Sequence, residues 1–317
     1  MKPSAAALIV GLCLSTPLLA DPPGVIRGRA ELQARARRPV SLLSSPVRLA
    51  QTGNGNLLVS DYRGQRIVEM DNRGRTIVRS FSIPGRPLAV AATDSQVYVG
   101  NESTHRVEVY DPTGQRLFNL GGLTHAFEQP TDIAIDIQQQ LVFVVDGQAK
   151  LVKVFDMSAG APGTLLGTIP PSGPDPSLLT SPTGIALDTQ EQEVLVSDFG
   201  ASDGTTDPRV QIFSYAGSHL VSISGQAGMF GRRFSRPQGL AVDGAGHVFL
   251  ADSWLGAVIV LDRSTGAQLA TLGSYGTGPG QLALPLDIVI DQNSQDVLVT
   301  NNRPGRIEVF VEGAVLP

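Results

Sequence analysis

A six-fold internal repeat constrains this chain more than any other feature of its sequence. Six segments begin with Pro and continue as a short apolar strand, and successive segments start 41–55 positions apart. They start at Pro46, Pro87, Pro130, Pro182, Pro237 and Pro285. Self-similarity at such a period is typical of architectures in which each repeat forms one supersecondary unit.

Each opening strand is followed by further strand signals. A second apolar strand ends in Asp or Asn, a third follows, and a Gly-centred turn leads to a fourth, such as residues 115–120. The second strands end at Asp61, Asn101, Asp146, Asp198, Asp252 and Asn301. Four short strands per unit describe one β-propeller blade. The sequence therefore predicts an all-β fold, a six-bladed β-propeller of four-stranded antiparallel blades spanning residues 46–317.

The final repeat has no clear fourth strand before Pro317. Residues 35–44, in the arginine-rich segment 21–45, precede the first blade and have no other assignment. We expect them to supply the outermost strand of blade six and so close the ring, because a long unpaired strand edge invites association with other chains.

Residues 1–20 have the features of an export signal. Lys2 precedes an apolar run at residues 5–15, and Ala20 ends a plausible cleavage site. No later stretch approaches the roughly 18 apolar residues of a membrane-spanning helix. The single cysteine, Cys13, lies inside the signal, so the mature chain has no disulfides. We expect an exported protein, periplasmic or extracellular.

The charge distribution argues against nucleic-acid binding. The chain has a formal net charge of −5, and segment 21–45 together with Lys2 is positively charged. The remaining body has 18 basic and 27 acidic residues, a balance of −9. Such a body repels phosphate backbones, which proteins usually bind through a basic face.

The segment from Pro237 to Ser253, PQGLAVDGAGHVFLADS, resembles an NHL repeat, and related patterns recur in all six units between residues 46 and 311. The resemblance implies a propeller that binds a protein or peptide partner. Some members of the family bind RNA, which the acidic body and the export signal both oppose. Propellers host many unrelated functions, so the resemblance is stronger evidence for the fold than for the function.

Residues that recur in every blade are expected to be structural, because catalysis needs an asymmetric site. This applies to the Asp and Asn residues at the ends of the second strands, whose side chains suit turns. The irregular loops carry aromatic and Arg residues instead, which are favoured in binding hot spots. We predict a non-enzymatic binding face, with core packing as the alternative for some of its members. The predicted residues are Tyr62, Phe127, Phe199, Phe230, Arg233, Phe234 and Trp254.

Residues two positions after each opening Pro are expected to line the mouth of the axial channel. Among them are Arg48, Asp132 and Asp287. A metal-dependent hydrolase or lyase is the alternative function, with Asp132, Asp287 and Asn301 around a cation, as in the lactonase-like propellers that the chain resembles less closely. Calcium needs about six oxygen ligands, and these residues supply few of them. We therefore expect no cofactor for the binding module, and a calcium ion only if the protein is such a hydrolase or lyase. The four His residues share no blade position, which disfavours zinc.

Overall fold

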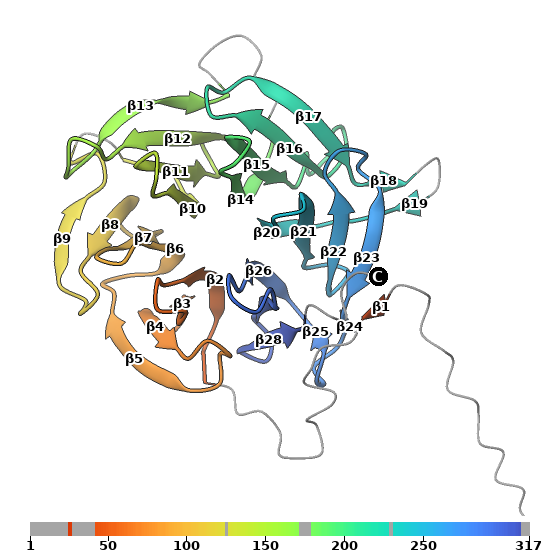
Figure 1. Ribbon diagram of the computed structural model, residues 1–317, viewed down its shortest axis with the longest axis horizontal. Helices are drawn as coiled ribbons and strands as arrows, with labels where there is room; N and C mark the ends of the chain where they lie inside the picture. Colours follow the sequence, from red (N-terminus) through yellow and green to blue (C-terminus); the bar gives the residue numbers. More distant parts are fainter. Residues whose placement is uncertain (1–24, 27–41, 124–125, 171–178, 228–230, 312–317) are drawn as a thin grey trace, which may run out of the picture.

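The computed structural model describes residues 25–26, 42–123, 126–170, 179–227 and 231–311. Six antiparallel sheets surround a central axis as the blades of a propeller (Figure 1). The predicted all-β, six-bladed architecture is confirmed. Within each blade the strands run outward in chain order, so the strand that begins at the repeat's Pro is always innermost.

The strand boundaries follow the sequence repeat. Blade one contains β2 (Pro46–Gln51), β3 (Leu57–Asp61), β4 (Arg66–Met70) and β5 (Ile77–Ser82), and blade two contains β6 (Pro87–Ala92), β7 (Val97–Asn101), β8 (Arg106–Tyr110) and β9 (Arg116–Asn119). Blade three contains β10 (Pro130–Asp136), β11 (Leu141–Asp146), β12 (Leu151–Asp156) and β13 (Thr164–Ile169), and blade four contains β14 (Pro182–Asp188), β15 (Glu193–Asp198), β16 (Arg209–Ser214) and β17 (His219–Ser224). Blade five contains β20 (Pro237–Val242), β21 (His247–Asp252), β22 (Ala257–Asp262) and β23 (Gln268–Leu272), and blade six contains β26 (Pro285–Ile290), β27 (Val297–Asn301) and β28 (Arg306–Phe310).

Two linkers between blades contain short strand pairs. β18 (Gln226–Ala227) pairs with β19 (Gly231–Arg232) before blade five. β24 (Ser274–Tyr275) pairs with β25 (Gln281–Leu282) before blade six. Both pairs lie on the side of the molecule where the inner strands begin.

The core lies between neighbouring blades, because a sheet buries both faces only when blades stack around the axis. Six apolar clusters each join two adjacent blades. The cluster between blades one and six joins Leu57 and Val68 to Leu298 and Ile307. Continuous apolar contact around the ring therefore holds the propeller together.

The predicted closing strand falls mainly on residues 35–41, which lie outside the described part of the chain. Residues 42–44 form no strand. Leu43 is buried between blades one and six, and its N–H donates to the carbonyl of Gly305 at 3.3 Å. Within the described ranges blade six thus has three strands. The sequence analysis missed β1 (Val25–Ile26), which pairs in parallel with β23 of blade five.

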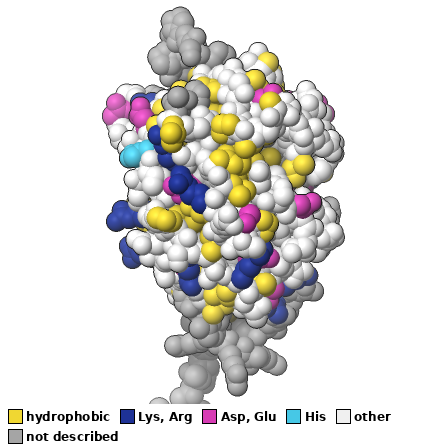
Figure 2. Space-filling model, turned by 90° about the vertical axis from the view of Figure 1, so that its left-hand side faces the viewer, with side chains coloured by type: hydrophobic (Ala, Val, Ile, Leu, Met, Phe, Trp, Pro, Cys, Tyr) yellow, Lys and Arg dark blue, Asp and Glu magenta, His cyan; other side chains and the backbone are white. Residues whose placement is uncertain are grey.

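The outermost strands expose aliphatic side chains around the rim. Leu117 of β9 and Leu166 of β13 are both exposed. Figure 2, which looks at the edge of the propeller on the left of Figure 1, shows apolar side chains scattered among polar ones. Apolar atoms make up much of any protein surface, so this rim does not by itself indicate a site.

Candidate site at the loop face of the axial channel

One backbone contact repeats in all six blades and defines a face of the molecule. The N–H of the residue after the second strand donates to the carbonyl of the residue before the opening Pro, as in Phe199 to Ser181 and Ser253 to Arg236. The linkers between blades and the loops after the second strands therefore meet on one side. We call this side the loop face.

The recurring Asp and Asn side chains hold these linkers in place. Asp146 accepts the backbone N–H groups of Glu128 and Gln129 at 2.8–3.0 Å and pairs with Lys153. Asp198 is likewise buried and accepts the N–H of Ser181 at 2.7 Å. Their role is structural, because each carboxylate satisfies backbone donors that would otherwise be buried without a partner.

A cup of about 520 Å³ lies at the centre of the loop face. Its lining includes the residue that follows the opening Pro in every blade, together with several residues that precede it. The residues that follow Pro are Val47, Leu88, Thr131, Thr183, Gln238 and Leu286, and those that precede it are Ser45, Gln129, Ser181 and Arg236. Because all six inner strands begin here, one side chain per blade converges on the axis.

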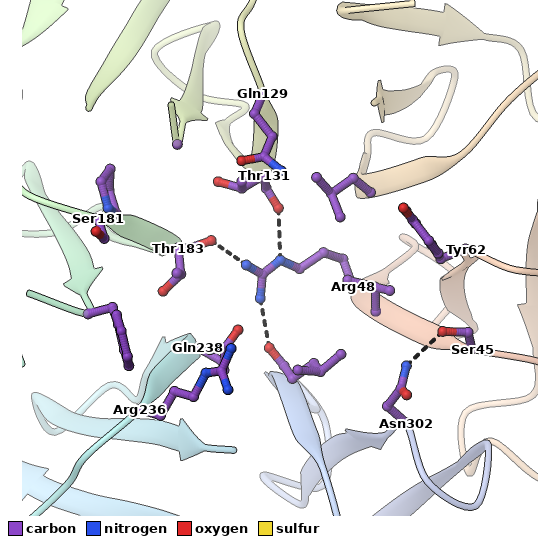
Figure 3. Close-up of a pocket in the computed structure, with 16 residues that line it drawn as sticks. Ser45, Arg48, Tyr62, Gln129, Thr131, Ser181, Thr183, Arg236, Gln238 and Asn302 are labelled. Atoms are coloured by element: carbon purple, nitrogen blue, oxygen red, sulfur yellow. Dashed lines mark hydrogen bonds between the residues drawn. The ribbon is translucent and has the colours of Figure 1, made fainter. Parts of the chain in front are cut away.

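Arg48 forms the floor of the cup. Its side chain crosses the channel and donates to the carbonyls of Thr131 (3.0 Å), Leu286 (2.7 Å) and Thr183, which belong to blades three, six and four (Figure 3). Only 3% of Arg48 is exposed. A guanidinium is a rigid planar fork of donors, so it can join three blades at once. Arg48 therefore closes the axial channel.

Two buried carboxylates contact this guanidinium. Asp132 lies 3.5 Å from Nε of Arg48, and Asp287 lies 3.7 Å from Nη1. Each also accepts a backbone N–H from the adjacent blade, from Ile185 and Leu49 respectively. Burial and the charge of Asp132 raise the pKa of Asp287 to about 8, although Arg48 opposes this shift. Burial also raises the pKa of Asp132, again against the effect of Arg48.

Arg48, Asp132 and Asp287 together form one layer across the channel. Glycine at the equivalent position of blades four and five makes room for this layer. A Cβ atom on Gly239 would collide with the carboxylate of Asp287. A Cβ atom on Gly184 would lie 2.8 Å from the Cα of Gly239 and 3.0 Å from the hydroxyl of Ser197. Glycine is thus required here because the blades approach one another closely at the axis.

Aromatic rings on the wall of the cup stack with arginine side chains. The guanidinium of Arg86 lies 5.5 Å from the ring centre of Tyr62, and that of Arg236 lies 5.5 Å from the ring centre of Phe199. The hydroxyl of Tyr62 also donates to Glu102. Such cation–π contacts hold both rings and cations in fixed positions. The wall therefore presents a preorganised aromatic and cationic surface.

The structure places the predicted binding-face residues in different surroundings. Tyr62 and Phe199 line the cup, and Trp254 is 72% exposed in the loop after β21. Phe127 and Phe234 are only 3% and 0% exposed, so their prediction as contact residues is wrong. Phe127 is buried in the apolar cluster between blades two and three, and Phe234 in the cluster between blades four and five.

Arg233 is half-buried, and its guanidinium donates to the carbonyl of Gly266 at 2.7 Å, so it supports blade five. Phe230 lies outside the described residues. Sequence analysis missed Arg236, which the repeat could have identified because it directly precedes an opening Pro.

The residues of the alternative cation site are not arranged around a common centre. Asp132 and Asp287 contact Arg48, whereas the Asn301 side chain accepts the N–H of Ala283 and donates to the carbonyl of Gln281. Across the described ranges, no three His, Cys, Asp or Glu side chains come together as metal ligands. Asp132 and Asp287 already contact the guanidinium and Asn301 is bonded elsewhere, so the three residues do not supply the roughly six oxygen ligands that a calcium ion needs.

Comparisons with known proteins agree with the fold. No protein-family model matches the sequence, and no curated protein is detectably similar. Among solved structures, hydrazine synthase from Kuenenia stuttgartiensis is similar over 88% of this chain and 99% of that chain, at 13% identity and a TM-score of 0.61. A gluconolactonase from Xanthomonas campestris is similar over 91% and 95%, at 16% identity and a TM-score of 0.62.

A third similar structure comes from a nidogen/laminin complex, over 72% of this chain and 80% of that chain, at 16% identity and a TM-score of 0.57. Identities this low show the fold alone, and the three proteins have different roles. The chain is therefore a six-bladed β-propeller whose function has to be argued from its own site. The described residues include no helix long and apolar enough to cross a membrane.

Proposed function

We propose that this protein is an exported, non-enzymatic binding module of the NHL type that holds a protein or peptide partner on its loop face. The observation that carries the proposal is the cup itself, with Tyr62 and Phe199 fixed by arginine stacking on its wall and Trp254 exposed on the same face. Aromatic and Arg side chains in fixed positions lose little conformational entropy on binding.

The lining of the cup supports recognition rather than catalysis. Its polar groups are mainly hydroxyl and amide side chains, including Thr131, Thr183 and Gln238. Arg48, the buried charged group of the floor, is held by three carbonyls and two carboxylates. Groups that are held in this way position a ligand through hydrogen bonds, whereas general acid–base catalysis needs a group that can transfer a proton.

Site-specific photo-crosslinking in cells that export the protein tests this proposal. A photoreactive amino acid replaces Trp254 in one variant and Leu166, which is also exposed but lies on the outer rim, in a matched control. We expect position 254 to crosslink one defined protein or peptide and position 166 to crosslink none. Equal crosslinking from both positions, or none from position 254, would rule out the loop face as the binding surface.

A further inference from the structure

The axial channel opens on the face opposite the cup into a second cavity of about 590 Å³, which we call the funnel. Its wall combines small and branched apolar side chains from the inner strands of all six blades with polar residues such as Gln51, Thr189 and Gln295. The apolar side chains include Ala50, Val90, Ile135, Leu187, Val242 and Ile290. Asp132 and Asp287 line the funnel but not the cup, whereas Arg48 lines the cup but not the funnel. The layer that closes the channel is therefore cationic on one side and anionic on the other.

Hydrogen bonding explains why the charges face opposite ways. Arg48 donates to carbonyls of residues that directly follow the opening Pro, at the loop face. The carboxylates of Asp132 and Asp287 instead accept N–H groups from Ile185 and Leu49, two positions further along the inner strands. Successive strand residues advance about 3.3 Å, so the two levels are separated along the axis.

The layer contains two buried carboxylates and one guanidinium. With both carboxylates ionised, one negative charge at the funnel floor has no positive partner in the described part of the chain. A buried charge without a partner is costly. The raised pKa of Asp287, caused by burial and by the charge of Asp132, reflects the same excess of negative charge. A cation bound at the funnel floor would balance this excess negative charge.

The face around the funnel is also acidic. Exposed or half-buried acidic residues in its turns and strand ends outnumber the basic Arg73, Arg75, Arg116 and Arg263. They are Asp71, Asp94, Asp111, Asp156, Asp188, Glu191, Glu193, Asp243 and Asp262. Hydrogen bonds from Ser264 and Thr265 lower the pKa of Asp262 to about 2, so this residue stays ionised at neutral pH. Such a surface attracts cations towards the funnel.

We propose that the funnel binds a small primary alkylammonium compound, with its ammonium group at Asp132 and Asp287 and its alkyl chain on the apolar side chains of the wall. An ammonium group has three donors, and each carboxylate has acceptor capacity beyond the backbone N–H that it accepts from the adjacent blade and its contact with Arg48. The apolar side chains favour an organic cation over a hard metal ion, which would need about six oxygen ligands. This site is on the face opposite the proposed partner surface and is independent of it.

Isothermal titration calorimetry of the purified protein tests the proposal with three probes of one chain length: n-pentylammonium, n-pentanol and pentanoate. We expect pentylammonium to bind at least ten-fold more tightly than either of the others. Affinity should also rise by about four-fold for each added methylene between ethyl- and pentylammonium, because each methylene is buried on the wall. Equal binding of the alcohol, or no dependence on chain length, would overturn the proposal.

Variants and competitors identify the site and the source of the cation. The double variant Asp132→Asn/Asp287→Asn should weaken pentylammonium binding at least ten-fold, whereas Leu166→Ala on the outer rim should leave it unchanged. Tighter binding of Nα-acetyl-lysine methylamide would point to the lysine of a partner protein and against a free amine. Displacement of pentylammonium by equimolar calcium would also contradict the proposal. The chain-length series in the unmodified protein remains decisive if the double variant does not fold.

Discussion

At the scale of single residues, Arg48 has the largest structural role. Its guanidinium joins blades one, three, four and six through one layer of hydrogen bonds and ion pairs. A buried network of this kind is costly when only half satisfied, because each group left behind has lost its contact with water. The closed channel and the different chemistry of its two ends both follow from this one side chain.

Arg48→Ala should therefore destabilise the whole propeller. It leaves two carboxylates and three carbonyls without their shared donor, and we expect a loss of about 3–5 kcal/mol in the free energy of unfolding. Arg48→Lys should recover only part of this loss, because a single ammonium group lacks the planar fork that reaches three blades. Urea denaturation followed by circular dichroism measures both variants. A loss below about 1 kcal/mol for Arg48→Ala would show that the layer contributes little.

The titration of Asp287 makes stability depend on pH. Its pKa is raised from 3.8 to about 8 in the folded protein by burial and by Asp132, with Arg48 opposing. The folded state thus holds a proton on Asp287 that the unfolded state releases. The contribution of this protonation to the free energy of unfolding is fully present below pH 4 and is lost as pH rises towards 8.

We expect the melting temperature to fall between pH 5 and pH 8 more steeply in the unmodified protein than in Asp287→Asn, which cannot ionise at this position. A difference of about 2 °C or more would correspond to roughly 1 kcal/mol. Differential scanning calorimetry at several pH values makes the comparison. Parallel pH profiles for the two proteins would show that Asp287 does not titrate in this range.

At the scale of strands and linkers, the repeat explains most of the fold. The second and third strands were predictable because their apolar pattern is local, and the predicted ends at Asp61 and Asp252 are the observed ones. The burial of Phe127 and Phe234 was not predictable, because it depends on how a linker folds back. The parallel pairing of β1 with β23 and the reach of Arg48 across the ring join residues far apart in the sequence and have no local signal.

The closing strand remains a prediction at this scale. β28 is largely buried although no fourth strand follows it in the described ranges. We expect deletion of residues 21–41 to lower the melting temperature by several degrees, because it would expose the edge of blade six. Deletion of residues 21–45 should cost more, since it also removes Leu43 from the cluster between blades one and six. An unchanged melting temperature after the shorter deletion would contradict closure by residues 35–41.

At the scale of the whole molecule, the propeller presents two different ends on one rigid ring. The loop face combines the cup with aromatic rings and arginines, and the opposite face combines the funnel with an acidic surface. The six apolar clusters leave the blades little freedom to move relative to one another. Binding therefore has to rely on a preformed surface, which a substitution on that surface should weaken directly.

The affinity of the protein for the partner identified by crosslinking tests directly whether the loop face is the binding surface. Calorimetry would compare the unmodified protein with Trp254→Ala, with Phe199→Ala and with the rim control Leu166→Ala. If the loop face is the binding surface, each of the first two should bind at least ten-fold more weakly, since hot-spot side chains contribute about 2 kcal/mol or more. Leu166→Ala should bind normally. Loss of binding only in Leu166→Ala, or normal binding in all three variants, would show that the partner does not bind the loop face.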